Sequence, residues 1–330
     1  MAALKVGFVG SGGMARAHAP GIAKMKNVKI VGFSDPVLDR AEVIAAEYDA
    51  QAFAKPEDMM DALKPDAVYM MLPPFAHGPE FAAIERKIPF LVEKPINLYL
   101  KQANEIAAAV EKAGLITCAG YMNRYRKGIQ KAKKLLEKDP AVLVTGGWIG
   151  GKPSVNPDAP ISVWWVQKKL SGGQFIEQVT HTVDLVRFLC GDAVEVSAFA
   201  ATGFNTGIPT YDIEDAMAVT VKFAGGAVAN LNSCCASGAM GGVDLNVYAG
   251  KIGFKFTGWE HTAQVYRPGK DPETWPGEGD IFAIEDAAFL KAVRTGDPSG
   301  IMSTYSDAVK TLAISIAADE SVKKGKVVKV

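Results

Sequence analysis

The stretch "LKVGFVGSGGMA" (residues 4–15) decides the fold class of this chain. It holds a short apolar run, a glycine-rich turn and the start of a helical pattern. A second apolar run, "VKIVGF" (28–33), follows it, so that strand, turn, helix and strand fit within about 30 residues. This is the size and order of a βαβ unit, in which a helix joins two parallel strands.

The same alternation continues along the N-terminal part of the chain. Further short apolar runs, separated by helical patterns, lie near Ala52 and at 66–72, 89–95 and 115–120. Strands that alternate with helices form parallel sheets that carry helices on both faces. The sequence therefore predicts an α/β fold whose first domain spans residues 1–120.

The glycine-rich turn has the spacing of a dinucleotide-binding turn. Its pattern is GxGxxA: Gly10 permits a tight turn, Gly12 lets backbone N–H groups approach a pyrophosphate, and Ala15 permits close helix packing. Asp35 ends the second apolar run, where a carboxylate accepts hydrogen bonds from an adenosine ribose and repels a 2′-phosphate. These residues predict a Rossmann domain that binds NAD in preference to NADP. The alternative interpretation is a plain βα turn followed by a turn at Asp35.

Two later strand ends are predicted to face the same ligand. "LPPFAH" (72–77) and "EKP" (93–95) close two of the strands, and ligands of such sheets bind at the carboxyl ends of strands. Lys94 is placed there to hold a substrate oxygen and stabilise charge on it, although an ordinary surface lysine explains this residue alone equally well. The predicted cofactor-binding residues are Gly10, Gly12, Gly13, Met14, Asp35, Leu72, Pro73, His77, Glu93 and Lys94.

The remaining residues, 121–330, predict a second domain of a different type. Between 193 and 258, strand-like runs follow one another without long helices between them, which indicates antiparallel pairing. Helical patterns at 174–189, 281–295 and 304–323 accompany these strands.

The stretch "SGGQFIEQVTHTVD" (171–184) opens on a glycine pair and carries Glu177, His181 and Asp184 at spacings of four and three. On a helix, these three side chains fall within about 60° of one another. They form either one wall of a reaction site or the solvated face of an ordinary amphipathic helix. The residues of this stretch alone leave both interpretations open.

The composition narrows the range of partners. Lys+Arg and Asp+Glu both number 36, and this neutral balance argues against nucleic acid or an anionic membrane as the main partner.

The four cysteines lack CxxC spacing, so we expect no bound metal, and four thiols suit a reducing cytoplasm. The sequence has no run of 18 apolar residues that would predict a membrane span, and its first residues predict a strand, not a signal peptide.

Together, these motifs resemble those of the Gfo/Idh/MocA oxidoreductase family. The matching segments are "VGFVGSGGMA", "SDP", "LPPFAH", "VEKP", "GYMNRYRKGIQKAKK" and "SGGQFIEQVTHTVDLVRFL". The resemblance implies a Rossmann domain followed by an α/β domain with an open, largely antiparallel sheet, and a cis Lys94–Pro95 peptide bond. It also implies hydride transfer at a hydroxyl of a sugar, a cyclitol or a sugar derivative.

The resemblance further implies roles for individual residues. Lys94 and His181 take catalytic positions, and Asp184 takes a substrate-binding position. Glu177 stands where the family usually has aspartate, so its carboxylate is displaced by about one methylene. We expect His181 to accept the hydroxyl proton, Glu177 to orient the imidazole, and Lys94 to stabilise the developing alkoxide.

Three functions are compatible with these residues. The chain is an NAD-dependent dehydrogenase of a sugar or cyclitol, an NAD-dependent glycosidase that works by transient oxidation and elimination, or a non-catalytic NAD-binding regulator. We favour the first, because a regulator has no need of the catalytic lysine and histidine. Asn123 and Trp165 are predicted to contact the substrate, and the free face of an open sheet predicts a homodimer or homotetramer.

Overall fold

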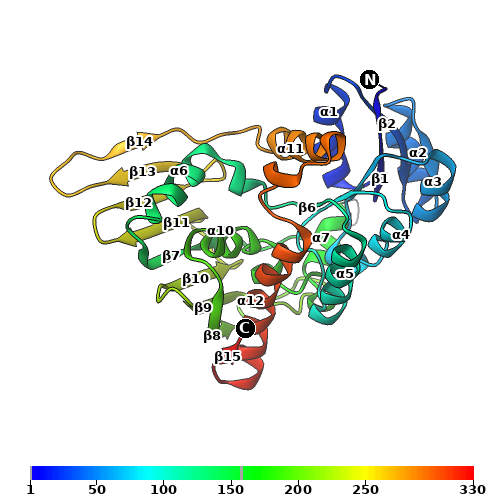
Figure 1. Ribbon diagram of the computed structural model, residues 1–330. Helices are drawn as coiled ribbons and strands as arrows, with labels where there is room; N and C mark the ends of the chain where they lie inside the picture. The colour runs from blue at the N-terminus through cyan, green and yellow to red at the C-terminus, as the bar shows by residue number, and fades with distance from the viewer. Residues whose placement is uncertain (1, 157–158) are drawn as a thin grey trace. The chain divides into compact units, whose positions relative to one another are not determined.

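The computed structural model describes residues 2–156 and 159–330 (Figure 1). The chain divides into two compact units. The first contains the residues up to Met122 together with Asp280–Val309, and the second contains Asn123–Gly279 together with Lys310–Val330. The sequence boundaries, by contrast, assigned everything after residue 120 to the second domain.

The first unit is built on a six-stranded parallel sheet with the order β3-β2-β1-β4-β5-β6. The order reverses between β1 and β4, as in a doubly wound nucleotide-binding fold. The predicted alternation of apolar runs and helices is therefore confirmed. The strands are β1 (Leu4–Val9), β2 (Val28–Ser34), β3 (Gln51–Phe53), β4 (Ala67–Met70), β5 (Phe90–Val92) and β6 (Thr117–Ala119).

Helices pack on both faces of this sheet, because its strands are apolar on both sides. On one face, Phe8 and Tyr69 are buried in a core shared with α1, α2 and α11. On the other face, glycines let α3 come close: a Cβ on Gly7 would lie 3.0 Å from Met59 Cε. The helices are α1 (Gly13–Ala23), α2 (Leu38–Ala46), α3 (Pro56–Leu63), α4 (Glu80–Glu85), α5 (Leu100–Ala113) and α11 (Phe282–Thr295).

Helix α11 returns to the first unit although it lies far along the chain. Its side chains Phe289 and Leu290 are buried in the same core as Phe8. Its predicted helical pattern is confirmed, but the pattern does not reveal which sheet the helix covers. The apolar side of α11 packs beside α1, and this contact assigns residues 280–309 to the first unit.

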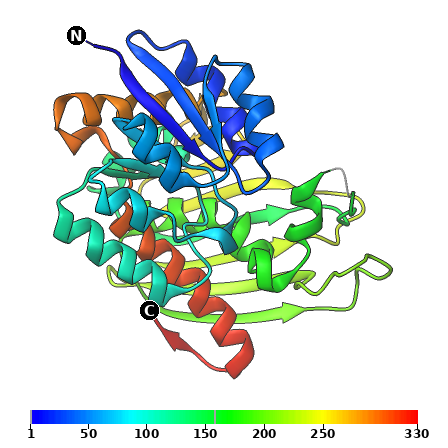
Figure 2. The same ribbon diagram turned by 90° about the vertical axis from the view of Figure 1, so that its right-hand side faces the viewer.

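The second unit is built on a nine-stranded sheet with the order β14-β13-β12-β11-β7-β10-β9-β8-β15 (Figure 2). Its neighbouring strands in the described part pair antiparallel, apart from the parallel pair β7–β10. The predicted, largely antiparallel second sheet is thus confirmed. The strands are β7 (Ala141–Ile149), β8 (Ala193–Ala201), β9 (Ala216–Phe223), β10 (Val228–Cys234), β11 (Gly242–Ala249), β12 (Gly253–Thr257), β13 (Thr262–Tyr266), β14 (Glu273–Trp275) and β15 (Val328–Lys329).

One face of the nine-stranded sheet carries the core of the second unit. Val144, Val219 and Leu245 on the strands are buried there together with Val183 and Ile314 from helices. The helices with residues in this unit are α6 (Lys127–Leu136), α7 (Pro160–Trp165), α8 (Lys168–Ser171), α9 (Gln174–Glu177), α10 (Thr180–Cys190) and α12 (Tyr305–Lys324). In the described part of the chain, none of the helices is long and apolar enough to cross a membrane.

The opposite face of this sheet is at least partly exposed and carries polar side chains together with exposed apolar ones such as Phe199 and Tyr248. Thr145, Thr220, Asn230 and Asn246 are neighbours in cross-strand register and form what we call the open face. Asn230 Nδ2 donates to Thr220 Oγ1 at 3.3 Å, and Asn246 Nδ2 donates to Thr145 Oγ1 at 3.4 Å. Alternation of buried and exposed residues along the strands creates this face.

A glycine in the central strand β7 is essential to the close approach of its neighbours. A Cβ on Gly147 would lie 2.0 Å from the carbonyl oxygen of Asn232 on β10. We predict that Gly147→Ala lowers the free energy of unfolding by roughly 1–3 kcal/mol, because the strands must separate. Chemical denaturation measures this change. The control Gly128→Ala, on α6 with its nearest neighbours at 3.9 Å, should be neutral or slightly stabilising. Equal stability of wild type and Gly147→Ala would contradict the packing argument.

Candidate functional site

In the glycine-rich turn between β1 and α1, only glycine fits at position 10. This residue has φ +93°, and a Cβ would lie 2.4 Å from the Met71 carbonyl oxygen. A Cβ on Gly12 or Gly13, in contrast, would meet no described atom within 4 Å. The bare backbone at the start of α1 is therefore free to receive an anion at the positive end of the helix. Met14 follows in the first turn, partly buried against the core.

Asp35 holds this turn from the end of β2. Its Oδ2 accepts from the Ser11 backbone N at 3.1 Å, and its Oδ1 accepts from the Val37 backbone N at 2.9 Å. A carboxylate has further lone pairs, so ribose hydroxyls can also donate to it. Ser11 Oγ is buried and has no hydrogen-bond partner among the described residues. The turn thus fits a dinucleotide, and the preference for NAD over NADP stays a prediction.

His77 follows β4 after Leu72, Pro73 and the short 3-10 helix η1 (Pro74–Ala76). Its Nδ1 lies 2.6 Å from Glu80 Oε1. Burial raises the pKa of Glu80, but the charge and hydrogen bond of His77, with backbone N–H groups, outweigh it and hold that pKa below its ordinary value. The carboxylate is therefore ionised and keeps the proton on Nδ1. His77 Nε2 is buried without a partner among the described residues, so it is available for a hydrogen bond with a ligand.

Glu93 and Lys94 follow β5, and the Lys94–Pro95 peptide bond is cis, as the family resemblance implied. Glu93 is buried, and its Oε2 accepts from the Lys94 backbone N at 3.1 Å. Lys94 itself is half-buried. The predicted lysine thus stands at the carboxyl end of a central strand, where ligands of such sheets bind.

A buried histidine that the sequence did not single out contacts Glu93. His18 Nε2 lies 3.1 Å from Glu93 Oε1, and His18 Nδ1 lies 2.8 Å from Asp286 Oδ1. Carboxylates only accept hydrogen bonds, so two of them favour an imidazolium that donates to both. Burial lowers the pKa of His18, but the hydrogen bonds and charges of Asp286 and Glu93 outweigh it and raise this pKa to about 10. No sequence spacing could reveal the cluster, because Asp286 lies on α11.

In the second unit, the glycine pair before α9 is required by the backbone. Gly172 and Gly173 have φ of +75° and +88°, and a Cβ on Gly173 would lie 2.7 Å from Glu214 Oε2. The predicted single helix over 174–189 is wrong, because α9 ends at Glu177 and α10 begins at Thr180.

A widened turn separates these two helices. The Val179 backbone N donates to the Gln174 carbonyl oxygen at 3.1 Å, five residues back. The Gln174 side chain donates from Nε2 to the Trp148 carbonyl oxygen at 3.3 Å and to Gln178 Oε1 at 3.2 Å. The angular estimate for Glu177 and His181 on one continuous helix therefore does not apply.

Glu177 and Trp165, predicted as a catalytic and a substrate-binding residue, contact each other. Trp165 Nε1 donates to Glu177 Oε2 at 2.9 Å, and both residues are buried. The tryptophan therefore fixes one oxygen of the carboxylate. Its indole N–H is satisfied, which suits a buried tryptophan.

His181 lies against an aromatic pair that the sequence did not reveal. The His181 and Trp259 rings meet edge to face, with centroids 5.6 Å apart at 87°, and Trp148 lies 5.7 Å from Trp259. His181 is buried, whereas Trp259 is 39% exposed. Trp148 lies on β7 and Trp259 lies in the turn between β12 and β13, so no local sequence pattern predicts that they meet. The structure thus surrounds the predicted base with a partly accessible aromatic surface.

Arg126 holds the turn that carries Trp259. Its Nη2 donates to the Trp259 carbonyl oxygen at 2.8 Å, its Nη1 donates to Glu260 and Glu278 carbonyl oxygens, and its Nε donates to Asn123 Oδ1 at 2.7 Å. Burial lowers the pKa of this guanidinium. Asn123, predicted to bind substrate, is 2% exposed, and its Nδ2 has no partner among the described residues.

His261 supports the same turn. Burial lowers the pKa of His261 to about 4, so the ring is neutral at physiological pH. Its Nδ1 lies 3.0 Å from the Trp259 carbonyl oxygen and donates to it in this state. Arg126 and His261 thus both fix the backbone of Trp259.

Asp184 is engaged within the second unit. Arg124 donates to both of its oxygens, from Nε at 2.7 Å and from Nη2 at 2.6 Å, and Thr311 Oγ1 donates at 2.9 Å. The carboxylate is 1% exposed. The predicted contact between Asp184 and substrate stays a prediction, and the geometry favours an effect of this residue through Arg124.

The described residues contain no cluster of three or more His, Cys, Asp or Glu side chains that could hold a metal ion.

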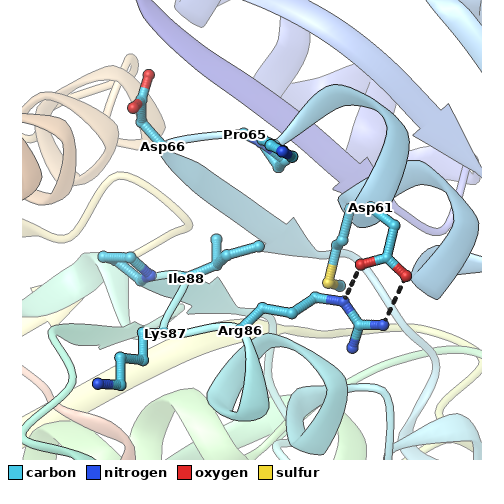
Figure 3. Close-up of a pocket in the computed structure, with 9 residues that line it drawn as sticks. Asp61, Pro65, Asp66, Arg86, Lys87 and Ile88 are labelled. Atoms are coloured by element: carbon cyan, nitrogen blue, oxygen red, sulfur yellow. Dashed lines mark hydrogen bonds and ion pairs between the residues drawn. The ribbon is translucent and has the colours of Figure 1, made fainter.

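A surface pocket of about 490 Å³ in the first unit lies at the amino ends of the parallel strands, opposite to the predicted ligand site (Figure 3). Two of its lining residues, Asp66 and Pro89, directly precede β4 and β5. There, Arg86 forms a two-point ion pair with Asp61, with N–O distances of 2.7 and 2.8 Å. None of the predicted site residues lines this pocket.

Comparison with known families assigns the class of the protein. A family model described as "Oxidoreductase family, NAD-binding Rossmann fold" matches residues 4–121, and a "GFO/IDH/MocA C-terminal domain" model matches residues 150–251. The first unit is thus an NAD-binding Rossmann domain of an oxidoreductase. The chain belongs to the Gfo/Idh/MocA family, as the motifs indicated.

Relatives align along nearly the whole chain. It is 25% identical over 339 residues to the "scyllo-inositol 2-dehydrogenase (NAD(+))" of Bacillus subtilis, covering 98% of this chain and 95% of that protein. It is 23% identical over 346 residues to the "Myo-inositol 2-dehydrogenase" of Thermotoga maritima, covering 99% and 98%. An "NAD binding oxidoreductase from Klebsiella pneumoniae" has a similar structure, with a TM-score of 0.88, 23% identity, and coverage of 100% and 99%. That structural likeness shows the shared fold.

The charge on His18 predicts a pH dependence of stability. A folded-state pKa of about 10, against 6.5 for the free side chain, means that the stability contributed by His18 is complete below 6.5 and is lost as the pH rises through 10. Glu93, Asp286 and Tyr69 face this ring. Within this window, the free energy of unfolding should fall by about 1.4 kcal/mol per pH unit more in the wild type than in His18→Gln. Denaturant titrations at several pH values measure both slopes, and equal slopes would contradict a charged His18.

Proposed function

We propose that the chain is an NAD-dependent dehydrogenase that transfers a hydride between the hydroxyl-bearing carbon of a cyclitol or sugar and the nicotinamide. The observation that carries this proposal is the surroundings of His181. A buried imidazole beside an accessible aromatic surface and the free amide donor of Asn123 suits a ring with both C–H faces and hydroxyl groups. The inositol dehydrogenase names of two full-length relatives support the same substrate class.

The proposed roles follow from what each side chain can do. NAD, when bound, supplies the hydride acceptor at C4 of its nicotinamide. His181 removes the hydroxyl proton, since an imidazole changes charge near neutral pH. Glu177, itself held by Trp165, stabilises the imidazolium that forms. Lys94 stabilises negative charge on the reacting oxygen.

Several residues are proposed to position the two ligands. Asn123 Nδ2 donates to a substrate hydroxyl, and Trp259 covers an apolar face of the ring. Arg126 fixes both of these residues by direct hydrogen bonds. In the first unit, Asp35 accepts from the adenosine ribose and disfavours NADP, because its carboxylate repels a 2′-phosphate.

Incubation with NAD and a panel of inositols, sugars and glycosides tests the reaction class. Growth of NADH absorbance with a free cyclitol or sugar supports the dehydrogenase. Release of an aglycone from a glycoside without net NADH identifies the elimination mechanism in its place. Binding of NAD without turnover of any compound would favour the regulator.

The catalytic assignment predicts the behaviour of two alanine variants. His181→Ala and Lys94→Ala should each lower kcat by a factor of about 10²–10⁴, because each removes a group that acts on the reacting hydroxyl. The Kd for NAD should change little. Steady-state kinetics and NAD titration measure these quantities, with Lys101→Ala, an exposed lysine on α5, as the control. Near-normal turnover in both variants would reject the assignment.

We further propose that the open face is covered by a second copy of the chain in a homodimer or homotetramer. A sheet face without helices exposes strand surface that a partner can bury. Thr220→Arg, at the centre of the open face, should therefore lower the mass found by light scattering. Glu111→Arg, exposed on α5, should leave that mass unchanged. A monomeric wild type would contradict the proposal.

A further inference from the structure

Three elements that are distant in the sequence meet at one ionic cluster in the first unit. His18 on α1 lies between Asp286 on α11 and Glu93 at the end of β5. Their side chains are 0%, 1% and 3% exposed, respectively. We call these three residues the buried relay. It ends one residue before Lys94.

A buried ionic cluster is a poor way to stabilise a protein core. Removal of a charged group from water costs several kcal/mol, and apolar replacements of buried ion pairs often leave stability unchanged or higher. Strongly perturbed ionisable groups also gather at functional sites. The surrounding core is aromatic, with the Tyr69 and Phe282 ring centroids 5.9 and 4.9 Å from that of His18. Stability alone therefore does not explain the charged groups in this core. The adjacent residue with a proposed function is Lys94.

Glu93 connects the histidine to the lysine. Its Oε1 faces His18 Nε2, while its Oε2 accepts from the Lys94 backbone N at 3.1 Å. Because a carboxylate is planar and rigid, fixing one oxygen also fixes the direction of the other. Gly120 leaves room for the group, since a Cβ there would lie 2.8 Å from Glu93 Oε1. The carboxylate thus transmits the position of His18 to the backbone of Lys94.

The hydrogen bond from His18 Nε2 holds the Glu93 carboxylate in place where water is excluded. A buried carboxylate without such a donor turns toward water. That change would weaken its acceptor geometry toward the Lys94 N–H. Both nitrogens of the imidazolium carry protons, so that Nδ1 donates to Asp286 and Nε2 donates to Glu93.

We propose that His18, held by Asp286, is a positioning residue that acts through Glu93 to set the placement of the Lys94 amine. This role presupposes the proposed function, in which Lys94 stabilises the alkoxide. It assigns a task to two residues that touch neither the substrate nor the nicotinamide. A displacement of the amine by about 1 Å would be enough to slow hydride transfer by about 10²-fold.

A double-mutant cycle with Lys94 separates positioning from general damage. His18→Gln should lower kcat by about 10–10² in the wild-type background, with little change in the Kd for NAD. In the Lys94→Ala background the same substitution should have almost no further effect, because there is no amine left to position. Asp286→Asn should act in the same direction. Phe33→Leu, which alters the same core at a ring packed against Phe8 and Tyr48, should leave kcat unchanged.

An equal loss of kcat from His18→Gln in both backgrounds would overturn the positioning role and leave only a structural one. An unchanged kcat in both His18→Gln and Asp286→Asn would also overturn it. If His18→Gln does not fold, the cycle is run with Asp286→Asn, and the same two outcomes decide.

Chemical labelling of Lys94 gives a readout that needs no substrate. An amine-reactive anhydride at limiting amount, followed by peptide mass spectrometry, measures the reactivity of Lys94 relative to the exposed Lys101 in the same molecule. His18→Gln and Asp286→Asn should change this ratio, whereas Phe33→Leu should not. If no compound is turned over by the wild type, the proposed function fails, and the labelling ratio still decides whether the buried relay controls Lys94. An unchanged ratio in both variants would overturn that control.

Discussion

The close approach of backbone at Gly10 is the constraint on which the first unit depends. The Gly10 N donates to the Ser34 carbonyl oxygen at 2.7 Å, while any Cβ would meet the Met71 carbonyl oxygen. The ends of β1, β2 and β4 therefore converge where no side chain fits. This leaves bare N–H groups at the start of α1, next to Asp35, and so creates the place for a dinucleotide.

Much of this unit could be predicted from the sequence because its signals are local. A glycine turn after an apolar run, Asp35 at the end of the next run, and the "EKP" segment each lie within a few residues of the strand that positions them. The broken helix could not be predicted in the same way. The pattern from Gln174 to Leu189 is amphipathic throughout, and the interruption is visible in the backbone hydrogen bond from Val179 N to the Gln174 carbonyl oxygen, five residues back.

The missed residues share a physical reason. His18 has the appearance of an ordinary helix residue until α11 brings Asp286 to it, and Trp259 lies in a turn that Arg126 helps to hold in place. Both of these contacts join segments more than 100 residues apart, so sequence spacing does not reveal them. The assignment of α11 to the first sheet fails for the same reason, because an apolar helix face does not specify its partner.

The two predicted catalytic residues are held by the same kind of device. Lys94 follows a carboxylate that a buried histidine fixes, and His181 follows a segment whose carboxylate is fixed by the N–H of Trp165. Both stand where regular structure ends, one after a strand and the other beside a widened turn, so backbone hydrogen bonds alone define them poorly. Buried polar contacts from distant segments supply the missing constraint. In each unit, therefore, a buried polar contact lies next to a residue on which the proposed chemistry depends.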